Sequence, residues 1–137
     1  MSRKFFKRLS SVAIAFICVL TLAVPCSATI DSSARMTNID SAKCWVEIEN
    51  GEVLAYAKVD GVSGVEKCKV VLRIQEKQGI NWVTLDTRSE EAARYTVSAS
   101  SSIKATKGTT YRAQATVTVW VNGISESKTV TTQGETA

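Results

Sequence analysis

The fold of this chain follows from one stretch, Tyr111-Arg-Ala-Gln-Ala-Thr-Val-Thr-Val-Trp-Val-Asn-Gly123. From Tyr111 to Val121 every odd position is Tyr, Ala or Val, whereas the even positions carry Arg, Gln, Thr and one Trp. Strict alternation of this kind is typical of a long β-strand that buries one face. The Asn-Gly dipeptide at its end favours a type I′ hairpin turn, in which both central residues have positive φ. The sequence therefore predicts a hairpin with residues 124–131 as the returning strand.

Other parts of the chain have the same short, alternating character. Turn signals such as Asn50-Gly51, Asp60-Gly61 and Gln78-Gly79 separate them. In addition to 111–121, the expected strands cover residues 44–49, 52–59, 67–76, 80–86, 95–99 and 124–131. A brief helix-like turn is expected at 90–94 and a polar connection at 100–107. Seven short strands in a chain of this length predict an all-β fold, a single antiparallel β-sandwich over residues 42–132.

The first 28 residues have the three parts of a secretory signal peptide. A basic segment precedes an apolar run of 13 residues at 12–24, and Cys26-Ser-Ala28 forms a small-residue exit. We therefore expect cleavage after Ala28. As a helix, the apolar run would span about 20 Å, which is short of the roughly 30 Å hydrocarbon core of a membrane. Lipidation at Cys26 is an alternative, but Pro25 disfavours it.

The signal peptide changes how the charge of the chain is interpreted. Of the 17 Lys and Arg residues, four lie at positions 3, 4, 7 and 8, and the remaining 13 balance the 13 Asp and Glu residues. The mature chain is therefore formally neutral, and a basic surface for nucleic acid is not expected. We predict a secreted, extracellular bacterial protein with no stable membrane insertion after cleavage. A polar leader is expected at 29–41 and a flexible tail at 133–137.

Two cysteines remain after cleavage, Cys44 and Cys68. An even number in an oxidising compartment predicts a disulfide bond. Such a bond would close about 25 residues and contribute roughly 3 kcal/mol to stability. Two buried free thiols are the alternative. A zinc site is not expected, because the chain contains no histidine and two cysteines alone do not complete the four-ligand set.

The phrase Lys107-Gly-Thr-Thr-Tyr111-Arg-Ala resembles the E–F corner of immunoglobulin-like and fibronectin type III-like domains. That resemblance implies that Tyr111 forms a tyrosine corner, its hydroxyl bonded to an upstream backbone group. The cysteine and tryptophan pattern of antibody domains is not matched, since the cysteines lie in the first and third expected strands.

Residues 45–131 also resemble small, largely uncharacterised secreted proteins of Gram-positive (Firmicutes) bacteria. The resemblance is carried, in order, by Val71-Leu-Arg-Ile-Gln75-Glu, Trp82 with Leu85, Gly108-Thr-Thr-Tyr-Arg and Asn122-Gly-Ile-Ser-Glu126. It implies the fold and export, and it offers no catalytic residues.

The sequence does not favour catalysis. The absence of histidine removes Ser-His-Asp and Cys-His arrangements. Glu90 and Glu91 are adjacent, so their side chains should diverge rather than act as an acid/base pair. The serines of 100–104 are expected in a connecting loop, and no glycine-rich phosphate loop is present. We therefore expect no catalytic residue, cofactor or metal.

Three aromatic side chains are expected to point outward, because they alternate with apolar neighbours: Trp45, Tyr56 and Trp120. Exposed aromatic rings on a sheet are a candidate binding surface for an extracellular protein or glycan. The alternative is that they only pack across strands on the outer face. The leading hypothesis is a secreted non-catalytic binding module. A secreted antagonistic, bacteriocin-like protein is the second hypothesis, and a hydrolytic enzyme is the least favoured.

Overall fold

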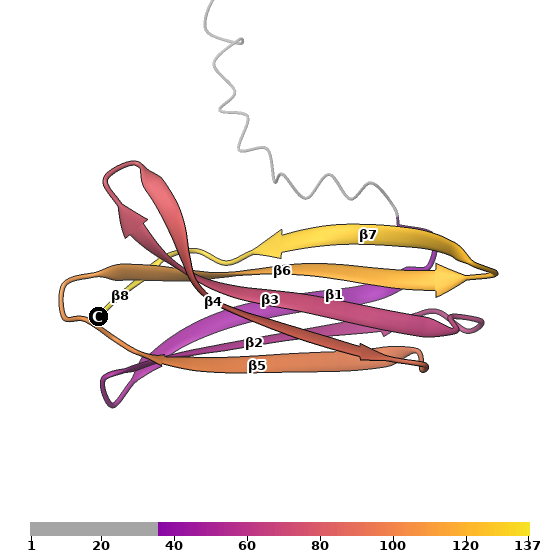
Figure 1. The fold of residues 1–137 in the computed structure, drawn as a ribbon. Coiled ribbons are helices and arrows are strands. Elements are labelled where there is room, and N and C mark those ends of the chain that lie inside the picture. Colours follow the sequence, from indigo (N-terminus) through magenta and orange to yellow (C-terminus); the bar gives the residue numbers. More distant parts are fainter. Residues whose placement is uncertain (1–35) are drawn as a thin grey trace, which may run out of the picture. The chain divides into compact units, whose positions relative to one another are not determined.

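The computed structural model describes residues 36–137, and this part of the chain is all-β (Figure 1). The predicted signal peptide, with its predicted cleavage site after Ala28, lies outside the described residues. The strands are β1 (Ile39–Glu49), β2 (Glu52–Gly61), β3 (Lys67–Gln78), β4 (Asn81–Ala92), β5 (Thr96–Lys104), β6 (Thr110–Val121), β7 (Ile124–Thr131) and β8 (Glu135–Thr136). Within residues 36–137 no helix is long and apolar enough to cross a membrane.

The strands form two antiparallel sheets, which confirms the predicted sandwich. The three-stranded sheet has the order β1-β2-β5, and the five-stranded sheet has the order β4-β3-β6-β7, with β8 paired to β6. Figure 1 shows the two sheets as facing layers, with β4 of one sheet running diagonally so that its end lies beside β5 of the other. In immunoglobulin-like nomenclature β1, β2 and β5 correspond to strands A, B and E, and β3, β6 and β7 to C, F and G.

The core lies between the sheets and is built from alternate residues of the central strands. On β6 the odd positions from Tyr111 to Val119 are buried, as the alternation predicted. On β3 the even positions from Cys68 to Ile74 are buried. On β2 the odd positions from Val53 to Val59 face them from the other sheet. Each of these residues is 4% exposed or less, so the strands fit together as a close-packed interior.

Two Asn-Gly turns set the register of the outer hairpins. At the β6–β7 turn, Asn122 has φ 51° and Gly123 has φ 76°, and Val121 pairs directly with Ile124. Positive φ at both central residues is the requirement for the type I′ turn, so that prediction is confirmed. Asn50-Gly51 makes an equivalent turn between β1 and β2, with φ values of 52° and 75°.

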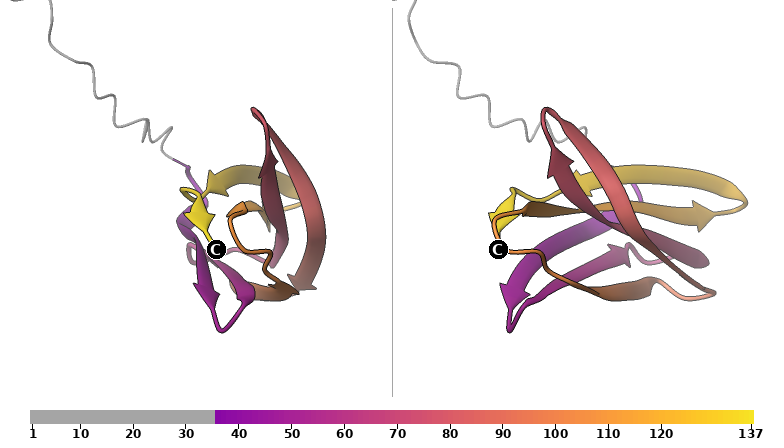
Figure 2. Two further views of the ribbon diagram at one scale, coloured as in Figure 1. Left: turned by 90° about the vertical axis from the view of Figure 1, so that its left-hand side faces the viewer. Right: turned by 60° about the vertical axis from the view of Figure 1, so that its left-hand side comes forward.

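The β3–β4 hairpin is longer than the sequence indicated. Residues 90–92, expected in a helix-like turn, belong to β4 and pair with β3 in the order Glu90–Val70, Glu91–Lys69 and Ala92–Cys68. Pairing explains the difference, because β3 offers hydrogen bonds and the Lys67 ammonium lies 3.2 Å from a Glu91 carboxylate oxygen. Figure 2 shows the tip of this hairpin rising away from the rest of its sheet.

The ends of the domain also differ from expectation. β1 begins at Ile39, three residues before the predicted domain start. The sequence predicts a flexible tail over 133–137, whereas Glu135 and Thr136 pair with β6 in the structure. β7 has ended by then, so the start of β6 has an open edge for β8. The Ala137 N–H donates to the Thr109 carbonyl over 3.0 Å, which extends the pairing.

Candidate functional site

Two aromatic side chains meet on the outer face of the three-stranded sheet. Trp45 of β1 lies directly opposite Tyr56 of β2. Their ring centroids are 4.4 Å apart and their planes are inclined by 33°. Both residues alternate with inward-facing neighbours, so the pleat of the sheet directs both rings outward. Trp45 is 47% exposed, and the pair therefore presents a flat apolar surface to solvent.

A groove of about 530 Å³ lies beside this pair, lined by β1, β2 and β5 and by one side chain of β4. Two cross-strand rows of outward side chains face it. The aromatic row consists of Trp45, Tyr56 and Ser100. The Leu54 row consists of Glu47, Leu54 and Ser102. The groove thus combines aromatic, aliphatic, hydroxyl and carboxylate groups in two neighbouring cross-strand rows on one face of the sheet.

Arg88 is the β4 side chain that lines the groove, and it contacts a carboxylate that is hydrogen bonded to the other sheet. The Arg88 Nε lies 3.7 Å from an Asp86 carboxylate oxygen. The same oxygen accepts a hydrogen bond from the Ser101 hydroxyl of β5. Ser101 is only 7% exposed, so this bond satisfies a buried polar group. The Arg88 side chain stays 61% exposed, which leaves its guanidinium open to a ligand in the groove.

The third predicted aromatic residue lies elsewhere. Trp120 belongs to β6 in the five-stranded sheet, where it pairs with Lys67 of β3. The Lys67 ammonium lies over the Trp120 ring, 4.2 Å from its centroid, in a cation–π contact. The structure therefore brings Trp45 and Tyr56 together and places Trp120 on the other sheet. The three residues do not form one patch.

Tyr111 is part of the core. The residue is 1% exposed, and its hydroxyl accepts a 2.7 Å hydrogen bond from the Thr106 backbone N–H. Tyr111 lies at the start of β6, and its bond to a backbone group five residues upstream has the form that a tyrosine corner requires. Tyr111 thus orders the β5–β6 connection and lies away from the groove.

The predicted Cys44–Cys68 bond is absent from the structure, in which both residues are free thiols. Cys44 lies on edge strand β1 and Cys68 on β3 of the opposite sheet. Facing sheets are about 10 Å apart, whereas bridged Cα atoms lie within about 7 Å, so sharing the apolar interior is not sufficient for a bond. Burial raises the pKa of the Cys44 thiol to about 11. Burial, together with the negative charge of Asp60, also raises the pKa of Cys68.

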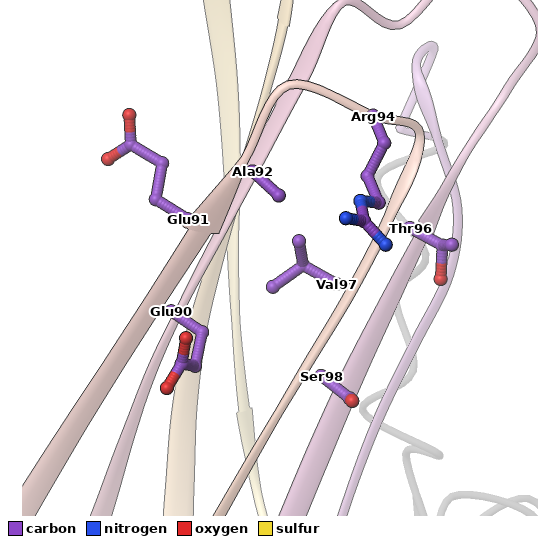
Figure 3. Close-up of a pocket in the computed structure, with 7 residues that line it drawn as sticks. All are labelled: Glu90, Glu91, Ala92, Arg94, Thr96, Val97 and Ser98. Carbon is purple, nitrogen blue, oxygen red and sulfur yellow. The ribbon is translucent and has the colours of Figure 1, made fainter.

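A second hollow, of about 410 Å³, lies between the end of β4 and the start of β5 (Figure 3). Ala92 and Val97 supply its apolar part, and Glu90 and Arg94 stand at its rim. The Glu90 and Glu91 carboxylates project in different directions in Figure 3, as expected for neighbours on a strand. Within residues 36–137, no three His, Cys, Asp or Glu side chains gather in a way that would hold a metal ion. No aromatic ring lines this hollow, so the groove is the stronger candidate site.

The sequence pattern did not predict that Ser100, Ser102 and Arg88 line the groove. Ser100 and Ser102 were expected in a connecting loop, but both lie in β5, which continues to Lys104. The alternation of Val97, Ala99, Ser101 and Ile103 is the signal for this longer strand, and the serine at its third inward position obscured it. Arg88 reaches the groove from the other sheet, and local alternation does not predict such a contact.

Comparisons with known proteins do not assign a family. No protein-family model matches the sequence, and no curated protein matches it. Among solved structures, OgpA from Akkermansia muciniphila is similar at 11% identity and a TM-score of 0.37, over 71% of this chain and 30% of OgpA. CsgH from R. palustris is similar at 14% identity and a TM-score of 0.38, over 66% and 91% of the two chains. A protein from Archaeoglobus fulgidus is similar at 13% identity and a TM-score of 0.37, over 72% and 97%. The chain therefore spans less than a third of OgpA, and we base no functional inference on these similarities.

Proposed function

We propose that this protein is a secreted, non-catalytic module that binds an extracellular glycan in the groove beside Trp45 and Tyr56. The observation that carries the proposal is the pairing of these two rings, 4.4 Å apart, on an exposed sheet face. The less polar face of a sugar ring packs on an aromatic ring, and its hydroxyl groups need hydrogen-bonding partners at the rim. Ser100, Ser102 and Arg88 provide donors there.

The composition of the groove supports binding rather than catalysis. Glu47 is its one carboxylate, and glycoside hydrolysis ordinarily needs two carboxyl groups that flank the scissile bond. The chain contains no histidine that could serve as a general base. The basic and apolar segments before Ala28 support export, which would place the groove in contact with cell-wall and environmental polysaccharides.

The proposal is tested with protein purified from the culture medium, whose mass should correspond to a chain that begins at Thr29. This protein is incubated with insoluble cell wall of the producing bacterium and with a panel of polysaccharides. We expect retention by a polysaccharide and a loss of affinity of about tenfold or more in Trp45→Ala, because buried aromatic anchors dominate binding energy.

Trp120→Ala is the matched control, since it removes the same side chain from the other sheet. It should bind as the wild type does. Thermal unfolding must show that Trp45→Ala is folded, because loss of the aromatic pair costs about 1 kcal/mol. Equal binding by the wild type and Trp45→Ala would contradict the proposal.

A further inference from the structure

The Leu54 row carries an inference about which sugar the groove accepts, and this inference rests on the proposed function. Leu54 is the only aliphatic side chain that points outward from β1, β2 and β5. In the register it is flanked by Glu47 of β1 and by Ser102 of β5. An isolated leucine between an acceptor and a hydroxyl offers three different contacts side by side.

These three contacts match the parts of an acetamido group. The methyl group of an acetamido group gains free energy when contact with aliphatic carbon removes its surface from water. The amide N–H of the acetamido group needs an acceptor, which the Glu47 carboxylate can supply. The carbonyl oxygen of the acetamido group needs a donor, which the Ser102 hydroxyl can supply. The bond from Ser102 to Glu52 is long, at 3.4 Å, so this hydroxyl can turn to a ligand.

The neighbouring row supplies the platform for the sugar ring. Tyr56 lies two residues beyond Leu54 on β2, so their side chains project from the same face about 6.8 Å apart. A pyranose ring over Trp45 and Tyr56 would therefore direct a substituent on an adjacent carbon towards Leu54. A plain hexose has only a hydroxyl at that carbon, so it lacks the methyl group that would contact Leu54.

We infer that the groove is selective for glycans built from N-acetylhexosamine, with the ring on the aromatic row and the acetamido group on the Leu54 row. Groove charge is consistent with a neutral ligand, because the Arg88 cation faces a site that also contains the Glu47 anion. An N-acetylated sugar is neutral and carries both hydrogen-bond donors and acceptors.

The test compares two oligosaccharides that differ in the acetamido group. The purified secreted protein is titrated with the β-1,4-linked tetramer of N-acetylglucosamine and with the β-1,4-linked tetramer of glucose, by calorimetry. We expect the acetylated tetramer to bind at least about tenfold more tightly, the discrimination that a small apolar contact typically gives. Leu54→Ser should remove most of this preference, because it weakens the binding of the acetylated tetramer more than that of the glucose tetramer.

Leu85→Ser is the matched control, because Leu85 is an exposed leucine of β4 outside the groove and its loss should leave both affinities unchanged. Equal affinity for the two tetramers, or an undiminished preference in Leu54→Ser, would overturn the inference. Retention on another polysaccharide that depends on Trp45, without binding of the acetylated tetramer, would overturn the inference and leave the proposed function intact. Absence of any Trp45-dependent retention would overturn both.

Discussion

At the scale of single residues, Tyr111 shows how one hydroxyl orders a connection. Its ring fills the core at the start of β6, and its hydroxyl accepts the Thr106 backbone N–H over 2.7 Å. That N–H belongs to the segment that carries the chain from one sheet to the other. Removal of its acceptor leaves a backbone donor without a protein partner in a part-buried position.

Tyr111→Phe should therefore lower the free energy of unfolding by about 1–3 kcal/mol, while the fold is retained. Chemical denaturation monitored by far-UV circular dichroism measures the loss. Tyr95→Phe is the control, because Tyr95 is 61% exposed and should tolerate the change. A Tyr111→Phe protein as stable as the wild type would show that the hydroxyl bond contributes nothing.

Cys44 is a single residue that should make the free energy of unfolding depend on pH. Its pKa is raised by burial from the usual 9.0 to about 11, so the folded state holds this proton more tightly than the unfolded state. The resulting contribution is complete below pH 9 and is lost as pH rises towards 11. We expect the unfolding free energy to fall over this interval, and the fall to be smaller in Cys44→Ala. Urea unfolding at steps of pH measures both proteins, and parallel pH profiles would contradict the assignment.

At the scale of elements, the sequence predicts those strands whose inward side is uniformly apolar. β6 followed the alternation of Tyr111 to Val121 over its whole length, and the Asn-Gly turns fixed the two hairpins that they close. The end of β4 and the strand β8 could not be predicted in this way. Each exists because a neighbouring strand has an open edge, which is a property of the assembled sheet rather than of the local residues.

The candidate site was predictable to the same extent. Alternation correctly directed Trp45 and Tyr56 outward, but it did not say which strands are neighbours. The register of β1 with β2 puts these two rings together, whereas the order of the sheets puts Trp120 on the opposite one. The cysteines illustrate the same limit, since a shared interior does not specify a distance.

At the scale of the whole molecule, hydrogen bonds to two side-chain carboxylates join the sheets along opposite sides. Asp86 and Ser101 connect β4 with β5. On the other side, the Glu126 carboxylate of β7 accepts the backbone N–H groups of Asn38, at 3.0 Å, and of Ile39, at 3.3 Å. These bonds hold the start of β1 beside the five-stranded sheet and satisfy donors at its edge.

Glu126→Gln should weaken the hydrogen bonds at this position, because a neutral amide has one acceptor oxygen where the carboxylate has two. We expect the unfolding free energy to fall by about 1 kcal/mol, and amide hydrogen exchange to accelerate at Asn38 and Ile39. Glu135→Gln on β8 is the matched control and should leave exchange at both positions unchanged. Unaltered exchange in Glu126→Gln would contradict the role of the carboxylate.

The order in which strands pair has a consequence for how the chain folds. β1 with β2 and β3 with β4 are local hairpins, but the central strands find their second partners far along the chain, Ala57 opposite Ala99 and Val70 opposite Val117. Isolated two-stranded hairpins are at best marginally stable in water. A growing chain that has not yet reached β5 and β6 therefore has no sheet with a covered apolar face. Its core forms late and cooperatively, at the slow rate expected where non-local pairings dominate.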